Sequence, residues 1–594
     1  MRFAQRWLAI LGGCLLTLVR SESPIDPCQN FYKYACGNWS AIHAEDPYSS
    51  LVEQLDYSYH EKLAELLENE EQHDGPRFQQ LLRDFYTSCR RPLTKDQVLG
   101  FLENLIEMPS LGEDELTVGL TAAFRPGALL DTSSFDLEKI WQELLFRTED
   151  WNPNETNTEP LTRQKFDLLW AGRLEGADLK KELVWDELSW LESQMMNTSS
   201  YEASDGAPVF WMLPWPEFRP DYRQLARLLA NKSKRFMLTY IYLRLKLVQG
   251  LGESWRIGRA ECADHARHIL THPSVWLMER HHPRLKEESV MQDIFQELKH
   301  RFGQRLRANR NNFSKHTQQF LLSKLDRMTL RLSVLPRRCS ERTLAQRIDR
   351  HYRDVHLSPS DYFGNLLVGL KHSRMQSDQY NMLSMISGSA SRNSLFPVQP
   401  YQYGTYASPF YLTESNMLIV PLSLLGPPLY TPQQPQILTY SSLGFVLGHE
   451  LSHGFDPEDV VLNSRGTASS SVRRELRKNR RFQRELNCLK GQFNSRLNEK
   501  FADANGLELA YSAYFDTAQT DGKRDRKVRD STDQKQQFFI NFAQFFCSDA
   551  DLLEDSTDHG SDRRRVNDAV FNFHPFLEAF SCRKTQNRRQ CRLF

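Results

Sequence analysis

Two histidines four residues apart, His449 and His453, lie in the apolar run YSSLGFVLGHELSHGFD. On a helix, this spacing places both imidazole rings on one face, one turn apart, where they can bind one metal ion. Glu450 would lie beside that metal, where a general base can take a proton from metal-bound water. Ser441 or Ser442 can cap the start of the helix. The run therefore predicts a zinc site that hydrolyses peptides. The alternative is a buried helix that contains histidines by chance.

A second segment, NEKFADANGLELAYSAYFD, can complete such a site. Glu499 and Asp503 are four residues apart on one helix face, where like charges repel unless a cation or an imidazole lies between them. Glu499 can be the third metal ligand, and Asp503 can accept the N–H of a ligand histidine and fix its tautomer. The alternative is a solvated acidic pair. No fourth protein ligand is evident, which favours a catalytic zinc site over a structural one.

The motifs HELSH, EKFAD and GLELAYSAY, in this order, resemble the neprilysin and endothelin-converting-enzyme family of zinc metallopeptidases. The stretches CQNFYKYACGNW, FFINFAQFFC and FLEAFSCRK extend the likeness towards both ends of the chain. The resemblance implies a mainly α-helical, two-lobed zincin ectodomain with a thermolysin-like catalytic lobe and a shortened helical upper lobe. It also implies one Zn²⁺ per chain, bound by His449, His453 and Glu499, and a substrate cavity between the lobes.

The same resemblance assigns residues to the scissile bond. His559 would stabilise the developing oxyanion and Arg565 would hold a substrate carbonyl, although both could be polar loop residues. Where the family has an Asn-Ala pair that binds the substrate backbone, this chain has Ser408 and Pro409. The loss of one such hydrogen bond, on the order of 1 kcal/mol, should weaken activity without abolishing it.

An apolar pocket beside the zinc would accept the residue after the cleaved bond, so a large hydrophobic residue should be preferred there. The plain alternative is that the lining residues belong to the hydrophobic core. These residues would be Leu424, Leu429, Phe445, Val446, Phe545 and Phe546. Some relatives hold a substrate's terminal carboxylate with arginines in the segment that reads SSLVEQLDYSYHEKL here. This segment contains no arginine, so endopeptidase action is expected.

The N-terminal run MRFAQRWLAILGGCLLTLVR is typical of a signal peptide, because its apolar core is too short to span a bilayer. No later run is apolar enough for a membrane helix, so the mature chain is expected to be secreted without a membrane span. The chain has 75 basic and 75 acidic residues, a balance that argues against a nucleic-acid partner. Five glycosylation sequons fit a secreted glycoprotein. They are Asn38, Asn154, Asn197, Asn231 and Asn312.

Ten cysteines become nine after removal of the signal peptide, and an odd count leaves at least one unpaired in an oxidising compartment. The family's disulfides, carried over by position, leave Cys339 without a partner, free or available to link two chains into a dimer. They would be Cys28–Cys582, Cys36–Cys547, Cys89–Cys262 and Cys488–Cys591.

Apolar periodicity predicts helices over 51–72, 291–310 and 313–336, whereas 417–425 is the best candidate for a strand. A loop-rich stretch at 387–404 marks a change in composition. The expected domains are a signal peptide (1–21), an N-terminal segment of the catalytic lobe (22–55), a helical upper lobe (56–386) and the zinc catalytic lobe (387–594).

The expected function is that of a secreted zinc metalloendopeptidase, a neprilysin-like hydrolase that cleaves peptides on the amino side of hydrophobic residues. Glu450 would activate zinc-bound water. One alternative is a secreted pseudo-peptidase that binds peptides with weak turnover or none, which would fit Ser408 and Pro409. Another is an extracellular protein in which zinc only joins two helices.

Overall fold

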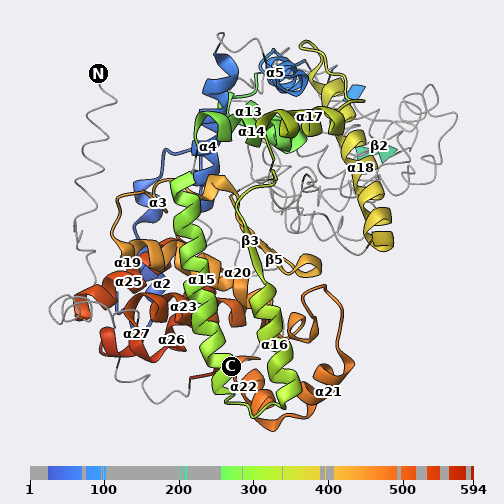
Figure 1. Cartoon of the computed structure of the whole chain (residues 1–594). Coiled ribbons are helices and arrows are strands. Elements are labelled where there is room, and N and C mark those ends of the chain that lie inside the picture. The colour runs from blue at the N-terminus through green and yellow to red at the C-terminus, as the bar shows by residue number, and fades with distance from the viewer. Residues whose placement is uncertain are drawn as a thin grey trace.

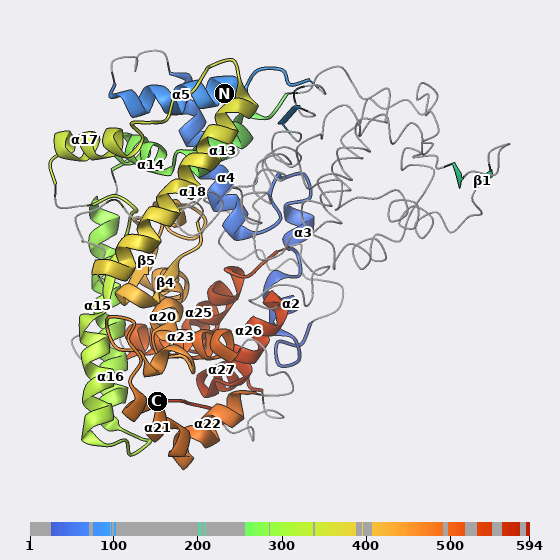
Figure 2. The ribbon, with the colours of Figure 1, turned by 90° about the vertical axis from the view of Figure 1, so that its right-hand side faces the viewer.

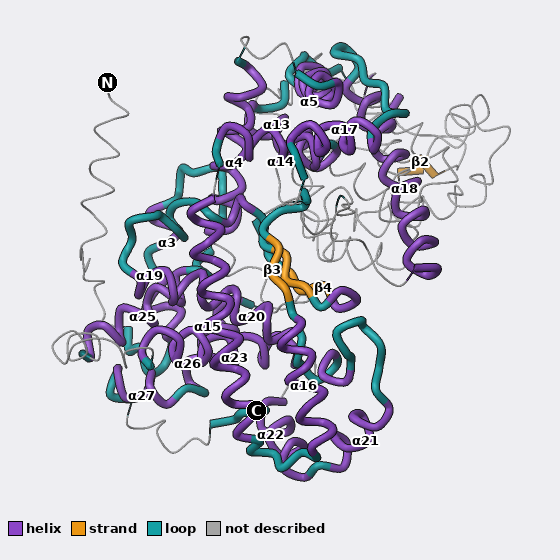
Figure 3. The backbone as a smooth tube through the Cα atoms, viewed as in Figure 1, coloured by secondary structure: helices purple, strands orange, loops and turns teal. Residues whose placement is uncertain are grey.

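Helices dominate the computed structural model of the chain (Figures 1 and 3). It describes residues 25–69, 75–94, 97, 100–101, 201–202, 208–209, 256–283, 285–336, 339–387, 395, 407–490, 497–516, 531–548, 561–582 and 590–594. The expectation of a mainly α-helical fold is confirmed. The expected signal peptide, His559, Asn154, Asn197 and Asn231 lie outside the described residues.

Helices at the top of Figure 1 form one group, here called the upper lobe, as far as the structure describes it. They are α5 (Arg77–Cys89), α13 (Arg259–Ile269), α14 (Thr271–His281), α17 (Glu341–His351) and α18 (Tyr362–Ser387). Helix α4 (Leu51–Glu68) packs against α13 and also against the short 3-10 helix η5 (Leu422–Leu424), so it connects this group with the catalytic side. Ser50 caps α4 by accepting a hydrogen bond from the Glu53 amide.

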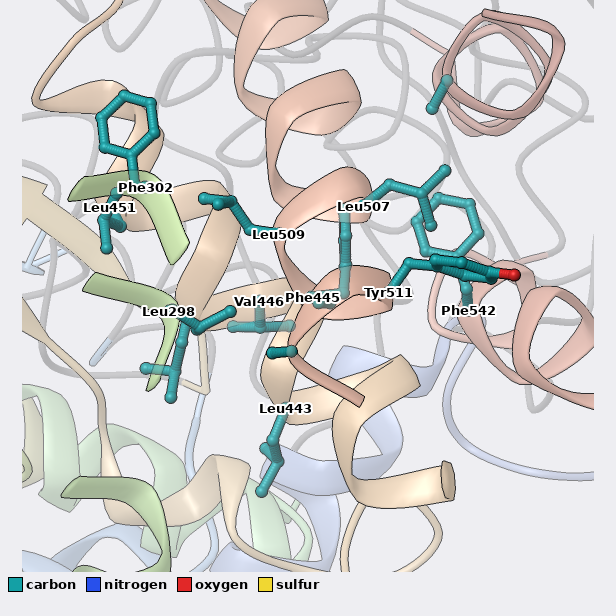
Figure 4. Close-up of a cluster of buried hydrophobic side chains, with 14 of the residues drawn as sticks. Leu298, Phe302, Leu443, Phe445, Val446, Leu451, Leu507, Leu509, Tyr511 and Phe542 are labelled. Atoms are coloured by element: carbon teal, nitrogen blue, oxygen red, sulfur yellow. The ribbon is translucent and has the colours of Figure 1, made fainter. Parts of the chain in front are cut away.

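The second group of helices surrounds one hydrophobic core. Figure 4 shows how Leu298 and Phe302 from α15 (Leu285–Ala308) meet Val446 and Leu451 from α20 (Phe445–His453) and Leu509 from α23 (Leu497–Phe515). Other members are α2 (Phe31–Cys36), α3 (Trp39–Ile42), α16 (Lys315–Arg327), α19 (Gln436–Thr439), α21 (Ser470–Lys478), α22 (Arg480–Lys490), α25 (Thr532–Gln544), α26 (Asp562–Phe571) and α27 (His574–Ala579).

Helices α15 and α16 lie next to each other along one side of this second group in both views (Figures 1 and 2). Their buried residues, among them Phe295 and Leu325, belong to the same core as the helices that carry the histidine motif. Buried residues between Met291 and Leu332, which the expected domain division assigns to the upper lobe, thus share their core with residues of the expected catalytic lobe. The division itself remains a prediction.

A three-stranded sheet lies between the two groups (Figure 3). Strand β5 (Met417–Ile419) is central, with β3 (Thr329–Arg331) parallel on one side and β4 (Phe410–Leu412) antiparallel on the other. Within the described residues, the outer edge of β4 pairs with no strand. Only the first three residues of the expected strand 417–425 belong to a strand, because the chain enters the 3-10 helix η5 directly after Pro421. The strands of the described residues also include a two-residue antiparallel pair, β1 (Tyr201–Glu202) with β2 (Pro208–Val209).

Four disulfides tie distant segments together, and they are the pairs that the resemblance implies. They are Cys28–Cys582, Cys36–Cys547, Cys89–Cys262 and Cys488–Cys591. Cys339 is free and partly exposed. Two of the sequon asparagines, Asn38 and Asn312, are exposed. Among the described residues, no helix combines the length and the apolar composition that a bilayer crossing requires.

Candidate metal centre

The candidate metal ligands lie on two packed helices, α20 and α23. His449 and His453 are one turn apart on α20, and their Nε2 atoms are 3.1 Å apart. Glu499, in the first turn of α23, reaches both rings: Oε2 is 3.5 Å from His449 Nε2, and Oε1 is 3.4 Å from His453 Nε2. Across the residues that the structure describes, this is the one group of His, Cys, Asp or Glu side chains whose donor atoms converge, within 4.8 Å, closely enough for a metal ion.

Two carboxylates lie at the Nδ1 atoms of the imidazole rings, on the side away from the converging Nε2 atoms. Asp503 Oδ1 is 2.9 Å from His449 Nδ1, and Asp456 Oδ2 is 3.4 Å from His453 Nδ1. A carboxylate that accepts the Nδ1–H of a histidine leaves the Nε2 lone pair available for a metal and raises its basicity. The sequence predicts this arrangement for Asp503. Sequence reasoning missed Asp456, although its position three residues after His453 could have indicated it.

Arg565, on α26, binds the acidic side of the site. Its Nε and Nη2 donate to the two oxygens of Asp503 at 2.9 and 2.8 Å, and Nη2 lies 3.2 Å from Glu499 Oε2. Burial raises the pKa of Asp503, but Arg565 and His449 outweigh that effect and hold the pKa well below its usual value. Asp503 is therefore ionised over the physiological range. The resemblance implies a substrate contact for Arg565; in the structure, its guanidinium holds two carboxylates of the site.

The electrostatics of the site favour a cation. Burial lowers the pKa of His453, but its hydrogen bond with Asp456 and the charges of Glu450 and Glu499 outweigh burial and raise that pKa to about 9. Two imidazole nitrogens and a carboxylate oxygen that converge on one point form a donor set that zinc prefers. These residues therefore fit the metal that the family resemblance implies.

Two glycines let the helices approach closely enough to bring the ligands together. A Cβ atom on Gly506 of α23 would lie 2.7 Å from the backbone nitrogen of His449, and one on Gly448 would lie 3.0 Å from the Gly506 carbonyl oxygen. Atoms in real proteins essentially never approach a Cβ to less than 3.0 Å. Any larger residue at Gly506 would therefore push α23, with Glu499 and Asp503, away from α20. Sequence reasoning did not single out either glycine.

Glu450, the expected catalytic base, lies on α20, and the pair expected to bind substrate directly precedes a strand that packs against this helix. Glu450 is buried, with 6% exposure, one residue after His449, and its carboxylate is close enough to raise the pKa of His453. Ser408 and Pro409 are half-buried and directly precede the edge strand β4, which packs against α20.

Phe545 and Phe546, two of the residues expected to line the substrate pocket, form an apolar cluster around Phe445. Its ring centroid is 5.5 Å from that of Phe546, 6.1 Å from that of Phe545 and 5.9 Å from the ring of His449. All of the expected lining residues except Phe545 are almost completely buried, and all of them join the common core. Phe445 thus places this aromatic cluster next to the candidate ligand His449, and the role of all six expected residues in binding substrate stays a prediction.

The start of the histidine helix differs from the expectation. Ser441 and Ser442 do not cap it, because the chain is already helical from Gln436 through α19 and the π-helical turn η6 (Tyr440–Gly444). Their hydroxyls instead donate to the carbonyls of Ile437 and Leu438 inside the same helical segment. Serine hydroxyls commonly bond back to a carbonyl in this way when they lie within a helix.

Comparisons with known proteins agree with this geometry. Residues 27–149 and 408–592, together more than half of the chain, match family models described as Peptidase family M13. Human neprilysin is 27% identical over 278 residues, which cover 42% of this chain and 34% of neprilysin, so the match spans about a third of that relative. Mouse endothelin-converting enzyme-like 1 is 24% identical over 674 residues, covering 95% of this chain and 83% of that protein.

The fold also has a close counterpart among solved structures. The Mycobacterium tuberculosis zinc metalloprotease Zmp1, crystallised in complex with an inhibitor, superposes with a TM-score of 0.59. The superposition covers 98% of this chain and 99% of that one. At 16% sequence identity, this likeness shows a shared fold and no more.

Proposed function

The chain belongs to peptidase family M13, the neprilysin family of zinc metallopeptidases, and we propose that it is a zinc-dependent endopeptidase. The observation that carries the proposal is the convergence of His449, His453 and Glu499 on one point. Glu450, a potential general base, is buried beside this point. A protein that used zinc only to join two helices would have no chemical use for that glutamate.

His449, His453 and Glu499 would hold one zinc ion per chain, which would act as a Lewis acid that lowers the pKa of water to about 7. Asp503 and Asp456 would keep both ligand imidazoles in the required tautomer. Arg565 would hold Asp503 ionised and in place. These supporting groups matter because even small displacements of ligands lower metal affinity and activity.

Glu450 would act first as general base and then as general acid. It would take a proton from the water that attacks the substrate carbonyl carbon, and pass this proton to the amide nitrogen as the C–N bond breaks. The products are a free carboxylate and a free amine. His559 would stabilise the oxyanion that develops on the carbonyl oxygen.

A peptide substrate would bind in an extended conformation beside the segment that leads into β4, a common mode of peptide recognition. The backbone carbonyl of Pro409 and the hydroxyl of Ser408 would contact the substrate backbone. Hydrophobic residues just after the cleaved bond would contact the apolar cluster around Phe445, so cleavage should occur on their amino side.

The proposed location is extracellular. Four disulfides are typical of proteins that fold in an oxidising compartment, and the exposed sequons at Asn38 and Asn312 are accessible to glycosylation. Secretion would follow removal of the N-terminal segment 1–21. The partly exposed thiol of Cys339 could join two such chains.

The test is cleavage of a quenched peptide library by the purified chain, beside a Glu450→Gln variant and a sample treated with a chelator. Glu450→Gln preserves the shape of the side chain but removes its capacity to accept the proton. We expect cleavage before Phe and Leu in the wild type and none in either control. Equal cleavage by wild type and variant would overturn the assignment of Glu450. A zinc-loaded wild type that cleaves nothing would overturn the peptidase proposal.

A further inference from the structure

A strongly basic surface covers helices α21 and α22, at the end of the catalytic side furthest from the upper lobe (Figures 1 and 2). All of its charged side chains are exposed. They are Arg473, Arg474, Arg477, Lys478, Arg480, Arg481 and Arg484, here called the basic face. The whole chain has equal numbers of basic and acidic residues, so this concentration of positive charge is local.

The helical periodicity explains why the cations share one surface. Val472 and Leu476 of α21, and Phe482 of α22, are buried in the core, which leaves the arginines on the outward side of both helices. Asn479 links the helices rigidly, because its Oδ1 accepts hydrogen bonds from the amides of Arg481 and Phe482. The disulfide between Cys488 of α22 and Cys591 further anchors this pair of helices.

The two acidic residues of this region are held by contacts outside the basic face, and neither forms an ion pair with six of its seven cations. Glu475 accepts hydrogen bonds from the amide and hydroxyl of Ser314 and from the hydroxyl of Thr317. Glu485 is buried and accepts a hydrogen bond from the Arg592 amide. Within the described part of the chain, Arg484 alone among the seven approaches a carboxylate, at 3.7 Å from Glu485. The other six form no ion pair there, so their charge is available to a partner.

We propose that the basic face binds a sulfated glycosaminoglycan. Six of its seven cations are arginines, whose planar guanidinium groups bind sulfate or phosphate oxygens in pairs. Clusters of Arg and Lys over a short stretch are typical of heparin-binding and nucleic-acid-binding surfaces. The disulfides favour an extracellular setting, where sulfated polysaccharides are the abundant polyanions.

Other polyanions fit the surface less well. Stable insertion into a membrane surface requires apolar side chains beside the cations, and single-stranded nucleic acids are bound by stacking on aromatic rings. The large exposed hydrophobic residues of the described chain are Tyr34, Ile42 and Met375, and none of them lies on α21 or α22. A sulfated polysaccharide, which presents charges without bases or acyl chains, needs neither feature.

The experiment measures binding of the full chain to immobilised heparin as a function of NaCl concentration. The test variant is Arg474→Glu with Arg477→Glu, and the matched control, with the same change in net charge, is Arg342→Glu with Arg350→Glu on α17. All four arginines are exposed, so both variants should fold. We expect binding of the wild type and the control at 0.15 M NaCl. The test variant should bind at least about tenfold more weakly and with a shallower salt dependence, because fewer ions are displaced.

Two further probes fix the identity of the ligand. Desulfated heparin should not compete with heparin, and duplex DNA should compete more weakly than heparan sulfate. The proposal is overturned if the wild type does not bind heparin at 0.15 M NaCl, if both variants lose affinity equally, or if DNA competes as well as heparan sulfate. Peptide hydrolysis serves as an independent readout. It should be the same in the wild type and the test variant, because the basic face contains no residue of the metal centre.

Discussion

The buried ion pair between Asp56 of α4 and Arg267 of α13 connects the upper lobe to the segment that we propose to bind substrate. Arg267 Nη1 donates to Asp56 Oδ1 at 2.6 Å, and Nη2 donates to the hydroxyl of Ser423 in η5 at 2.9 Å. The second oxygen of Asp56 accepts a hydrogen bond of 2.7 Å from the amide of Ala407, directly before Ser408. Both charged side chains are almost completely shielded from solvent, with 0% and 2% exposure.

Replacing Arg267 with methionine should strongly destabilise this junction. The carboxylate of Asp56 would remain buried without its cation, and removal of one partner from a buried ion pair costs about 3–5 kcal/mol of unfolding free energy. Burial already raises the pKa of Asp56, and Arg267 opposes this shift. Without Arg267, the carboxyl should take up a proton as the pH falls, so the loss of stability should be larger at pH 7 than at pH 5.

The assay is urea unfolding combined with hydrogen exchange at the Ala407 amide. Arg259→Met is the matched control, because Arg259 lies on the same helix and pairs with Glu61 and Glu68 at a half-exposed site worth about 0–1 kcal/mol. The double variant Asp56→Asn with Arg267→Met should recover much of the lost stability. The reasoning is refuted if Arg267→Met unfolds like Arg259→Met, or if the double variant loses the sum of the two single effects.

Four further predictions concern the candidate metal centre, the upper lobe and Ser408, which precedes β4. Asp456→Asn should weaken zinc binding about 10–100-fold, measured by competition with a chelating dye, and unchanged affinity would contradict its orienting role. Gly506→Ala should separate α20 and α23 and so lower the zinc affinity. It should also lower the free energy of unfolding by about 1–3 kcal/mol. Wild-type values of both quantities would show that the helices do not need this close approach. Burial, together with neighbouring histidines, lowers the pKa of His351 to about 2, so between pH 7 and pH 5 the unfolded chain binds a proton that the folded chain does not. The unfolding free energy should therefore fall by about 2 kcal/mol on acidification from pH 7 to pH 5. In urea titrations at the two pH values, the His351→Phe variant should not show this loss. Ser408→Asn should raise kcat/KM about fivefold, corresponding to one hydrogen bond of about 1 kcal/mol, and a decrease would show that the amide has no partner in the substrate.

The pairs of residues that form the candidate metal centre were predictable because their signal is local. His449 is four residues from His453, and Glu499 is four residues from Asp503. Helical geometry places both side chains of each pair on one helix face. That the two faces meet could not be derived from either spacing. It depends on the close approach at Gly448 and Gly506, which is visible only once both helices are placed.

The partners of amphipathic helices were not predictable in the same way. The apolar stripes of α15 and α16 show that each helix buries one face, but periodicity does not say against what. Both pack into the core that also contains α20 and α23. The strand expected over 417–425 failed beyond Ile419 for a similar reason. A short apolar run fits a buried turn of 3-10 helix as well as it fits a strand.

The most direct test of the central claim is to measure zinc per chain and peptide hydrolysis in the same dialysed samples of wild type, Glu450→Gln and Glu499→Gln. The account predicts one zinc in the wild type and in Glu450→Gln, less than one in Glu499→Gln, and hydrolysis in the wild type alone. Full zinc retention by Glu499→Gln, or hydrolysis by Glu450→Gln at the wild-type rate, would contradict it.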